Sequence, residues 1–129
     1  GYFVQPTVFA DVDNAAPLAQ EEIFGPVLAI VPFEDEADAL AKANHNPYGL
    51  AAFLQTRDLD RALRVADGLD AGYVSVNGFA GLNPNLPFGG FKLSGYGKEG
   101  GPEGLDEFLR RKSVHIATAP SAIGHAKKS

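Results

Sequence analysis

Two adjacent carboxylates followed by an aromatic residue form the stretch with the clearest chemical potential. The stretch is EEIFGPV, residues 21–27, in which Glu21 and Glu22 precede Phe24. A glycine-proline pair then ends any helix and redirects the backbone into an apolar run. This order predicts a carboxylate and an aromatic ring together at the mouth of a buried strand. The structural alternative is an acidic pair in solvent, with the phenylalanine in the core.

A glycine-rich segment, residues 88–104, contains a pattern that imitates a dinucleotide-binding fingerprint. Gly95, Gly97 and Gly100 fit G-x-G-x-x-G. The pattern indicates a dinucleotide site only when a strand precedes it and an acidic residue follows about 20 residues later. A Lys-Leu-Ser triplet precedes it here, and residues 117–121 contain no acid. We therefore interpret the segment as a loop in which the backbone packs too closely for side chains.

The sequence gives little support for nucleophilic or metal-dependent chemistry. It contains no cysteine, so it offers no thiol nucleophile, thiolate ligand or disulfide. Ser94 has Lys92 where the nucleophile elbow of a serine hydrolase needs glycine. The histidines lack metal-ligand spacing, so we expect no metal site at His45, His115 or His125.

The composition is that of a globular protein, with 129 residues of which 45% are hydrophobic and 21% are charged. The net charge is -5 and there is no basic stripe, so we expect neither nucleic acid nor an acidic membrane surface as a partner. No apolar run approaches ~20 residues, and we expect a cytoplasmic protein. Because methionine is absent and a strand-like run begins at Gly1, we interpret the sequence as a piece of a longer protein.

Apolar runs and periodicity predict alternating strands and helices that would position these residues. Strands are expected at 27–31, 50–55 and 73–77, and helices at 35–43 and 58–69. The first strand is continuously apolar, which predicts burial on both of its faces. This alternation predicts an α/β fold, with a mainly parallel sheet and flanking helices.

Shorter signals complete the expected secondary structure of the first half. Residues 2–12 contain a proline and are expected to form an edge strand or an extended connector. Tyr48 and Gly49 are expected to form a turn. Asp60 and Arg64 stand four residues apart, which predicts an ion pair on one helix.

The C-terminal part is expected to contain a loop, a helix and a final strand. The loop covers residues 78–87, and the helix has Pro102 in its first turn and Phe108 on its apolar face. The strand is expected at 113–118 and a polar tail at 119–129.

Four stretches stand in unbroken order along the chain: GYFVQPTVF at 1–9, EEIFGPV at 21–27, NPYGLAAF at 46–53 and PFGGFKLSGYGKEGG at 87–101. Together they closely resemble the C-terminal quarter of the aldehyde dehydrogenase superfamily. The resemblance extends from Gly1 to about Ala117.

The resemblance divides the chain into three parts. It implies that residues 1–112 belong to the catalytic domain and that residues 113–118 form an oligomerisation-type strand. Residues 119–129 are a tail without useful similarity. The resemblance also implies a homo-oligomer.

The resemblance assigns cofactor-binding roles to the EEIFGPV motif. Glu22 matches a glutamate that hydrogen-bonds the nicotinamide ribose of NAD or NADP, and Phe24 matches a phenylalanine that packs near the nicotinamide. The chemistry is suitable, because a carboxylate accepts both hydrogen bonds of a diol and an aromatic ring restricts a flat heterocycle.

The resemblance also implies a substrate pocket. Phe88 matches a residue of the aldehyde tunnel, and Gly78, Ala80 and Leu82 belong to a variable loop whose small or aliphatic residues indicate an uncharged aldehyde. Glu99 matches a glutamate proposed as a proton relay. Its structural alternative is an acid placed near a helix N-terminus, where the dipole favours it.

The family oxidises an aldehyde to a carboxylic acid through a cysteine thiohemiacetal and thioester, with NAD or NADP as oxidant. This chain lacks the cysteine, so we expect the isolated chain to be inactive and the parent to be the enzyme. Its expected partners are the aldehyde and the remainder of the aldehyde dehydrogenase chain. The alternative hypothesis is a non-catalytic, stand-alone remnant that acts as a binding or assembly module.

Overall fold

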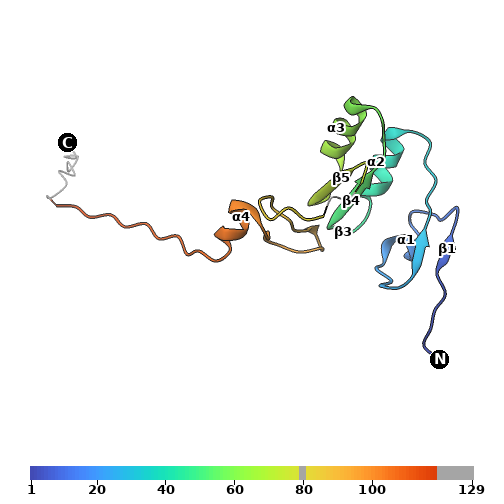
Figure 1. Cartoon of the computed structure of the whole chain (residues 1–129), viewed down its shortest axis with the longest axis horizontal. Coiled ribbons are helices and arrows are strands. Elements are labelled where there is room, and N and C mark those ends of the chain that lie inside the picture. Colours follow the sequence, from blue (N-terminus) through green and yellow to red (C-terminus); the bar gives the residue numbers. More distant parts are fainter. Residues whose placement is uncertain (79–80, 119–129) are drawn as a thin grey trace, which may run out of the picture.

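The structure of the chain is a computed structural model that describes residues 1–78 and 81–118 (Figure 1). In chain order the elements are β1 (Thr7–Phe9), α1 (Pro17–Gln20), β2 (Val27–Ala29), α2 (Glu36–Asn44), β3 (Tyr48–Gly49), β4 (Ala51–Leu54), α3 (Leu59–Gly68), β5 (Tyr73–Val76), β6 (Phe91–Lys92) and α4 (Gly101–Asp106).

The strands form three separate pairs. β1 pairs in parallel with β2, and β4 pairs in parallel with β5, from Ala51 opposite Tyr73 to Leu54 opposite Val76. β3 and β6 pair antiparallel. The expected α/β class and parallel strand pairing are therefore confirmed, but the described strands do not join into one sheet.

Helices α2 and α3 begin where the sequence predicts, because each has an aspartate as its N-cap. The carboxylate of Asp35 accepts a hydrogen bond from the Asp38 backbone N–H, and that of Asp58 accepts one from the Arg61 backbone N–H. Both helices lie beside the β4–β5 pair (Figure 1). Ala62 of α3, 7% exposed, is the one buried hydrophobic residue in the described chain, and no side chain there is fully buried. The centre of this small core is therefore the contact of α3 with its neighbours.

An ion-pair cluster joins α2 to α3. Glu36 Oε2 accepts from Arg61 Nε at 3.2 Å and from Arg64 Nη2 at 3.0 Å, and Glu36 Oε1 accepts from Arg64 Nε at 3.1 Å. The expected pair of Asp60 with Arg64 is wrong, because the guanidinium of Arg64 is engaged by the other helix. A two-pronged arginine-carboxylate contact is stronger than a single exposed one.

Two local predictions differ from the structure. The strand expected at 27–31 is shorter, and Leu28 and Ile30 are exposed, so the predicted burial on both faces is wrong. With β1 as its only strand neighbour in the described chain, β2 is part of a narrow ribbon whose faces stay open. Tyr48 and Gly49 form strand β3 instead of a turn. Gly49 allows this pairing, because a Cβ there would lie 2.6 Å from Asp70 O and 3.2 Å from Phe91 Cβ.

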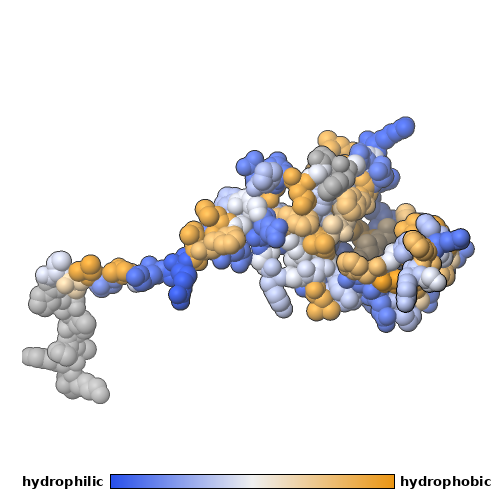
Figure 2. Space-filling view, turned by 60° about the horizontal axis from the view of Figure 1, so that its bottom comes forward, coloured by the Kyte–Doolittle hydropathy of each residue, from blue (hydrophilic) through white to orange (hydrophobic). Residues whose placement is uncertain are grey.

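The described chain exposes many apolar side chains, which Figure 2 shows as several patches on one face. Leu59 and Leu63 of α3 are 71% and 63% exposed, although helical periodicity predicts that they face the core. Phe108 is 87% exposed and lies beyond the end of α4. None of the helices in the described ranges is long and apolar enough to cross a membrane.

The last described segment leaves the body as an extended chain (Figure 1). Residues 113–118 form no strand in this single chain, so the expected strand is not observed. The reason is physical: a strand needs a neighbour for its backbone hydrogen bonds, and no described segment lies beside this one. Residues 119–129, the expected polar tail, lie outside the described residues.

Acidification should weaken the contact between α2 and α3. Hydrogen bonds from the Arg64 guanidinium, with a contribution from Arg61, hold the pKa of Glu36 below its usual value. A carboxylate with a lowered pKa in the folded state stabilises the fold above its unfolded pKa, and this contribution is lost as the pH falls through the folded pKa. We therefore expect Glu36→Gln to reduce the thermal midpoint at pH 7, and the difference from wild type to shrink as the pH falls below the usual pKa of glutamate toward its lowered folded value.

Circular dichroism of the helices between pH 7 and 3 measures this effect. Glu34→Gln is the matched control, because the Glu34 side chain makes no ion pair within the described residues. An equal loss of midpoint at pH 7 and pH 3 for Glu36→Gln would contradict the electrostatic explanation.

Candidate functional site

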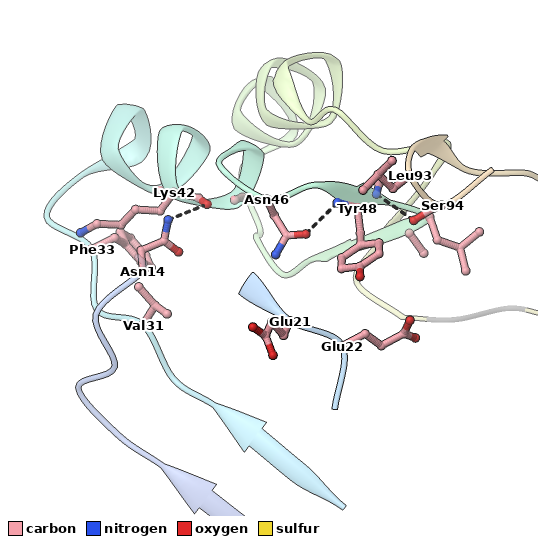
Figure 3. A pocket seen from close by; sticks show the side chains of 15 residues that line it. Asn14, Glu21, Glu22, Val31, Phe33, Lys42, Asn46, Tyr48, Leu93 and Ser94 are labelled. Atoms are coloured by element: carbon pink, nitrogen blue, oxygen red, sulfur yellow. Dashed lines mark hydrogen bonds between the residues drawn. The ribbon is translucent and has the colours of Figure 1, made fainter. Parts of the chain in front are cut away.

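The larger of two adjoining cavities contains the acidic pair of the EEIFGPV motif. It has a volume of about 880 Å³. Glu21 and Glu22 line one side, and Asn46, Tyr48 and Ser94 line the opposite side (Figure 3). The cavity thus lies between the segment after α1 and the β3–β6 pair.

The acidic pair is placed at the cavity by an abrupt end of α1. The Glu21 backbone N–H donates to Pro17 O at 2.8 Å, and Glu21 already has an extended conformation. Glu22 is exposed, and its carboxylate makes no hydrogen bond or ion pair within the described residues. Two acceptor oxygens at the edge of a cavity therefore remain available to a ligand.

The backbone of Phe24 has an unusual conformation for a bulky residue. Its φ is 55°, in the left-handed region, which costs about 1–3 kcal/mol. The side chain is 92% exposed, so the structure does not place it in a core. A strained backbone beneath an exposed aromatic ring makes Phe24 a candidate contact residue.

The β6 side of the cavity is fixed by Lys92 and Ser94. Lys92 Nζ donates to Asn44 O at 2.9 Å and Asn46 O at 3.1 Å, and it forms an ion pair with Asp70 at 3.1 Å. Ser94 Oγ accepts from the Gly49 backbone N–H at 3.0 Å. These contacts hold the turn after β6 against the end of α2, where a cation also opposes the helix dipole.

A second cavity, of about 750 Å³, adjoins the first through Leu50 and Ser94, which line both. Phe88 and Glu99 line this second cavity. The two residues exchange backbone hydrogen bonds of 2.7 Å in both directions, and the Phe88 ring lies edge-on to Tyr73 at 5.9 Å. The backbones of both residues are therefore fixed, although the Glu99 side chain is exposed.

Lys98 reinforces this arrangement. Its Nζ donates to Gly89 O at 3.1 Å and Gly90 O at 3.2 Å, and it lies 4.8 Å from the centre of the Phe91 ring. The close backbone approach expected for the glycine-rich segment is observed. A Cβ on Gly89 would lie 2.5 Å from Gly97 O, and one on Gly90 would lie 2.6 Å from Ser94 atoms.

The sequence-predicted residues occupy three places. Glu22 lines the first cavity, whereas Phe88 and Glu99 line the second. Phe24, Gly78 and Leu82 line neither of these two cavities, and all three are exposed. Ala80 lies outside the described residues.

Sequence reasoning missed Tyr48 and Ser94 as cavity residues. Ser94 was weighed only as a nucleophile, whereas its hydroxyl is a structural acceptor for Gly49. No local sequence pattern predicts a contact between residues as far apart in the chain as Gly49 and Ser94. Among the residues described, no group of three histidine, aspartate or glutamate side chains is arranged to hold a metal ion.

Comparison with known proteins identifies the family. The model of the aldehyde dehydrogenase family matches residues 1–114. The 4-(hydroxymethyl)benzenesulfonate dehydrogenase TsaD1 of Comamonas testosteroni is 50% identical over 115 residues, which are 89% of this chain and 24% of that protein.

Two solved structures have similar folds. An aldehyde dehydrogenase of Mycobacterium tuberculosis complexed with NAD+ has a TM-score of 0.84 at 50% identity, over 91% of this chain and 24% of that one. Betaine aldehyde dehydrogenase of Staphylococcus aureus, also with NAD+, has a TM-score of 0.88 at 40% identity, over 99% of this chain and 25% of that one. The chain belongs to the aldehyde dehydrogenase family. It spans about a quarter of the length of these relatives.

Gly72, just before β5, lies directly against the backbone of the glycine-rich segment. A Cβ on Gly72 would overlap Gly89 O, which is backbone and cannot rotate away. We expect Gly72→Ala to destabilise the fold by about 1–3 kcal/mol, because the added methyl forces the two backbones apart. Urea denaturation followed by circular dichroism measures the loss.

Gly25→Ala is the matched control for that experiment, because its nearest atom outside the adjacent residues would be Ile23 Cγ2 at 3.8 Å, an ordinary contact. Equal midpoints for the two variants would contradict the close approach of Gly72 to Gly89.

Proposed function

We propose that this chain is part of an NAD(P)-dependent aldehyde dehydrogenase, and that it contacts the nicotinamide end of the cofactor and lines the path of the aldehyde. The observation that carries this proposal is the carboxylate of Glu22, which lies at the edge of the larger cavity without a partner in the described chain. Membership of the family supports it, and so do the NAD+ complexes of the similar structures.

The residues present fit the nicotinamide ribose. Glu22 offers two acceptor oxygens to two hydroxyl groups, and a charged acceptor makes hydrogen bonds roughly twice as strong as a neutral one. The exposed ring of Phe24 follows two residues later and offers a flat apolar surface to a heterocycle. The cofactor, when bound, would accept a hydride. The role of these residues is to orient its reactive end.

The second cavity suits an apolar part of the substrate path. Its half-buried Phe88 offers an aromatic wall that is held at a fixed place by Glu99 and Tyr73. Lys98, Glu99 and Glu107 also line this cavity, so its apolar part is the side formed by Phe88 and Leu105. Gly78, Ala80 and Leu82, which the family resemblance places in the substrate loop, are uncharged residue types, and this supports an uncharged aldehyde. For Glu99, both hypotheses stay open: a proton relay, or an acid that favours the start of α4 at Gly101.

The reaction also requires groups that this chain does not contain. The sequence has no cysteine, so the nucleophile of the family chemistry would come from the remainder of the aldehyde dehydrogenase chain. In this proposal, the residues described here bind and orient, and the isolated chain does not turn over an aldehyde.

The role of Glu22 can be tested in the complete enzyme that contains this segment. Glu22→Gln keeps the size of the side chain but removes its charge, so the nicotinamide would be held less firmly. A displacement of about 1 Å can reduce the rate ~10²-fold. We expect a lower kcat and a primary isotope effect with deuterated aldehyde, while the KM for the cofactor changes little because its far end still anchors it.

Glu21→Gln is the matched control, because Glu21 lines the same cavity and its side chain also lacks a partner within the described residues. Wild-type turnover without an isotope effect in Glu22→Gln would contradict the proposed ribose contact. Glu21 and Glu22 would then be interpreted as an acidic pair that is simply exposed to solvent.

We also propose that the chain assembles with further copies through residues 113–118. The support is their exposure, since Val114 and Ile116 are 71% and 77% exposed on an extended segment. Unpaired backbone groups with apolar side chains invite strand pairing. The alternative function, a stand-alone assembly module, would also use this self-association. The many exposed apolar residues of the described chain favour that alternative.

Light scattering of the isolated chain at ~100 µM tests assembly, because pairing with micromolar affinity would be populated there. We expect a dimer or a larger species, and a smaller one after removal of residues 113–129. A monomeric mass for the whole chain would refute this assembly.

A further inference from the structure

The C-terminal end of α2 lies against the short helix α1, and two side-chain amides make the contact. Gln20 Nε2 donates to His45 O at 2.8 Å and to Asn14 O at 2.6 Å. In the opposite direction, Asn46 Nδ2 donates to Ala19 O at 3.0 Å. Gln20 thus binds the carbonyl group beside Asn46, and Asn46 binds the carbonyl group beside Gln20. We call Gln20 and Asn46 the reciprocal pair.

The same two residues connect directly to both sides of the larger cavity. Gln20 is the last residue of α1 and immediately precedes Glu21 and Glu22. Asn46 Oδ1 accepts from the Tyr48 backbone N–H at 2.8 Å, at the start of β3 (Figure 3). The reciprocal pair therefore spans the cavity from the acidic segment to the strand that faces it.

Apart from these two residues, the side-chain link from this part of the chain to the end of α2 comes from Asn14, whose Nδ2 lies 3.2 Å from Lys42 O and 3.4 Å from His45 Nδ1. A helix of four residues is not stable without tertiary contacts, because nucleation is costly and too few hydrogen bonds follow it. After Gln20, residues 21–26 are all exposed, and Phe24 has a strained φ. Both Gln20 and Asn46 are half-buried, so their hydrogen bonds are partly shielded from water.

We propose that Gln20 and Asn46 form an amide clamp that positions Glu22 at the cavity, so that both are positioning residues for the reaction. This inference rests on the proposed contact of Glu22 with the cofactor. The clamp also has a structural consequence that does not depend on the reaction. Residues 19–24 should stay ordered because Gln20 donates to two carbonyl groups.

The polarity of the clamp permits a sharp test. Gln20→Glu keeps the shape of the side chain, but it turns carboxylate oxygens toward the carbonyl oxygens of Asn14 and His45. Gln20→Lys keeps a donor on a long side chain and should restore the contact. Gln55→Glu is the matched control, since the Gln55 side chain is exposed and has no partner within the described residues.

Two measurements on the complete enzyme test the proposal. Hydrogen exchange should increase for residues 19–24 in Gln20→Glu, and remain at wild-type levels in Gln20→Lys and Gln55→Glu. The kcat of Gln20→Glu should fall about ten-fold with a larger isotope effect, a part of the ~10²-fold that a 1 Å displacement can cost. The KM for NAD+ should stay close to that of the wild type.

The outcomes separate the clamp from the proposed function. Unchanged exchange at residues 19–24 in Gln20→Glu would overturn the clamp, whatever the kinetics. Increased exchange with unchanged kcat would overturn its positioning role. In that case the Glu22→Gln variant tests the proposed function separately. A reduced kcat would support the cofactor contact of Glu22, whereas wild-type kinetics would contradict the proposed function as well.

Discussion

The carbonyl groups at the C-terminal end of α2 are the constraint on which the rest of the structure depends. The last carbonyls of a helix have no partner within it. Here they accept hydrogen bonds from distant side chains: Lys42 O from Asn14, and Asn44 O from Lys92. His45 O, in the loop that follows, accepts from Gln20. Three segments that are far apart in the sequence therefore meet at one helix end.

This convergence compensates for a weak core. Only one hydrophobic residue of the described chain, Ala62, is buried, and two-stranded pairs offer little area for packing. Gly49 in β3 and Gly72 just before β5 allow close backbone contacts. The loops that they meet also carry hydrogen bonds from the Gly49 N–H to Ser94 Oγ and from Lys98 Nζ to Gly89 O. Side-chain hydrogen bonds to backbone carbonyls are thus prominent among the long-range contacts of the described chain.

Helices α2 and α3 could be predicted because their signals are local. An aspartate cap, a helical apolar period and a stop signal all lie within the segment concerned. Strands β3 and β6 could not be predicted, because a two-residue antiparallel pair has too few residues to show a period. The partner of Arg64 was also missed. Its i,i+4 neighbour Asp60 is visible in the sequence, but Glu36 comes close only after the helices pack.

The candidate site was only partly predictable for a similar reason. Glu22 was singled out by its motif and by a family resemblance, both readable along the chain. Its neighbours Tyr48 and Ser94 depend on pairing between β3 and β6, which no sequence pattern announces.

The separate strand pairs have a mechanical consequence for the cavity. In the part of the chain that the structure describes, each hydrogen bond between residues 7–31 and residues 44–49 involves a side-chain amide. No backbone ladder crosses the gap, so its two walls are joined by side-chain hydrogen bonds instead of a rigid sheet. Substitution of Asn14, Gln20 or Asn46 would loosen this link without breaking any strand-to-strand bond. The separation of the two walls therefore depends on three amide groups, and these residues can change while the framework on either side stays the same.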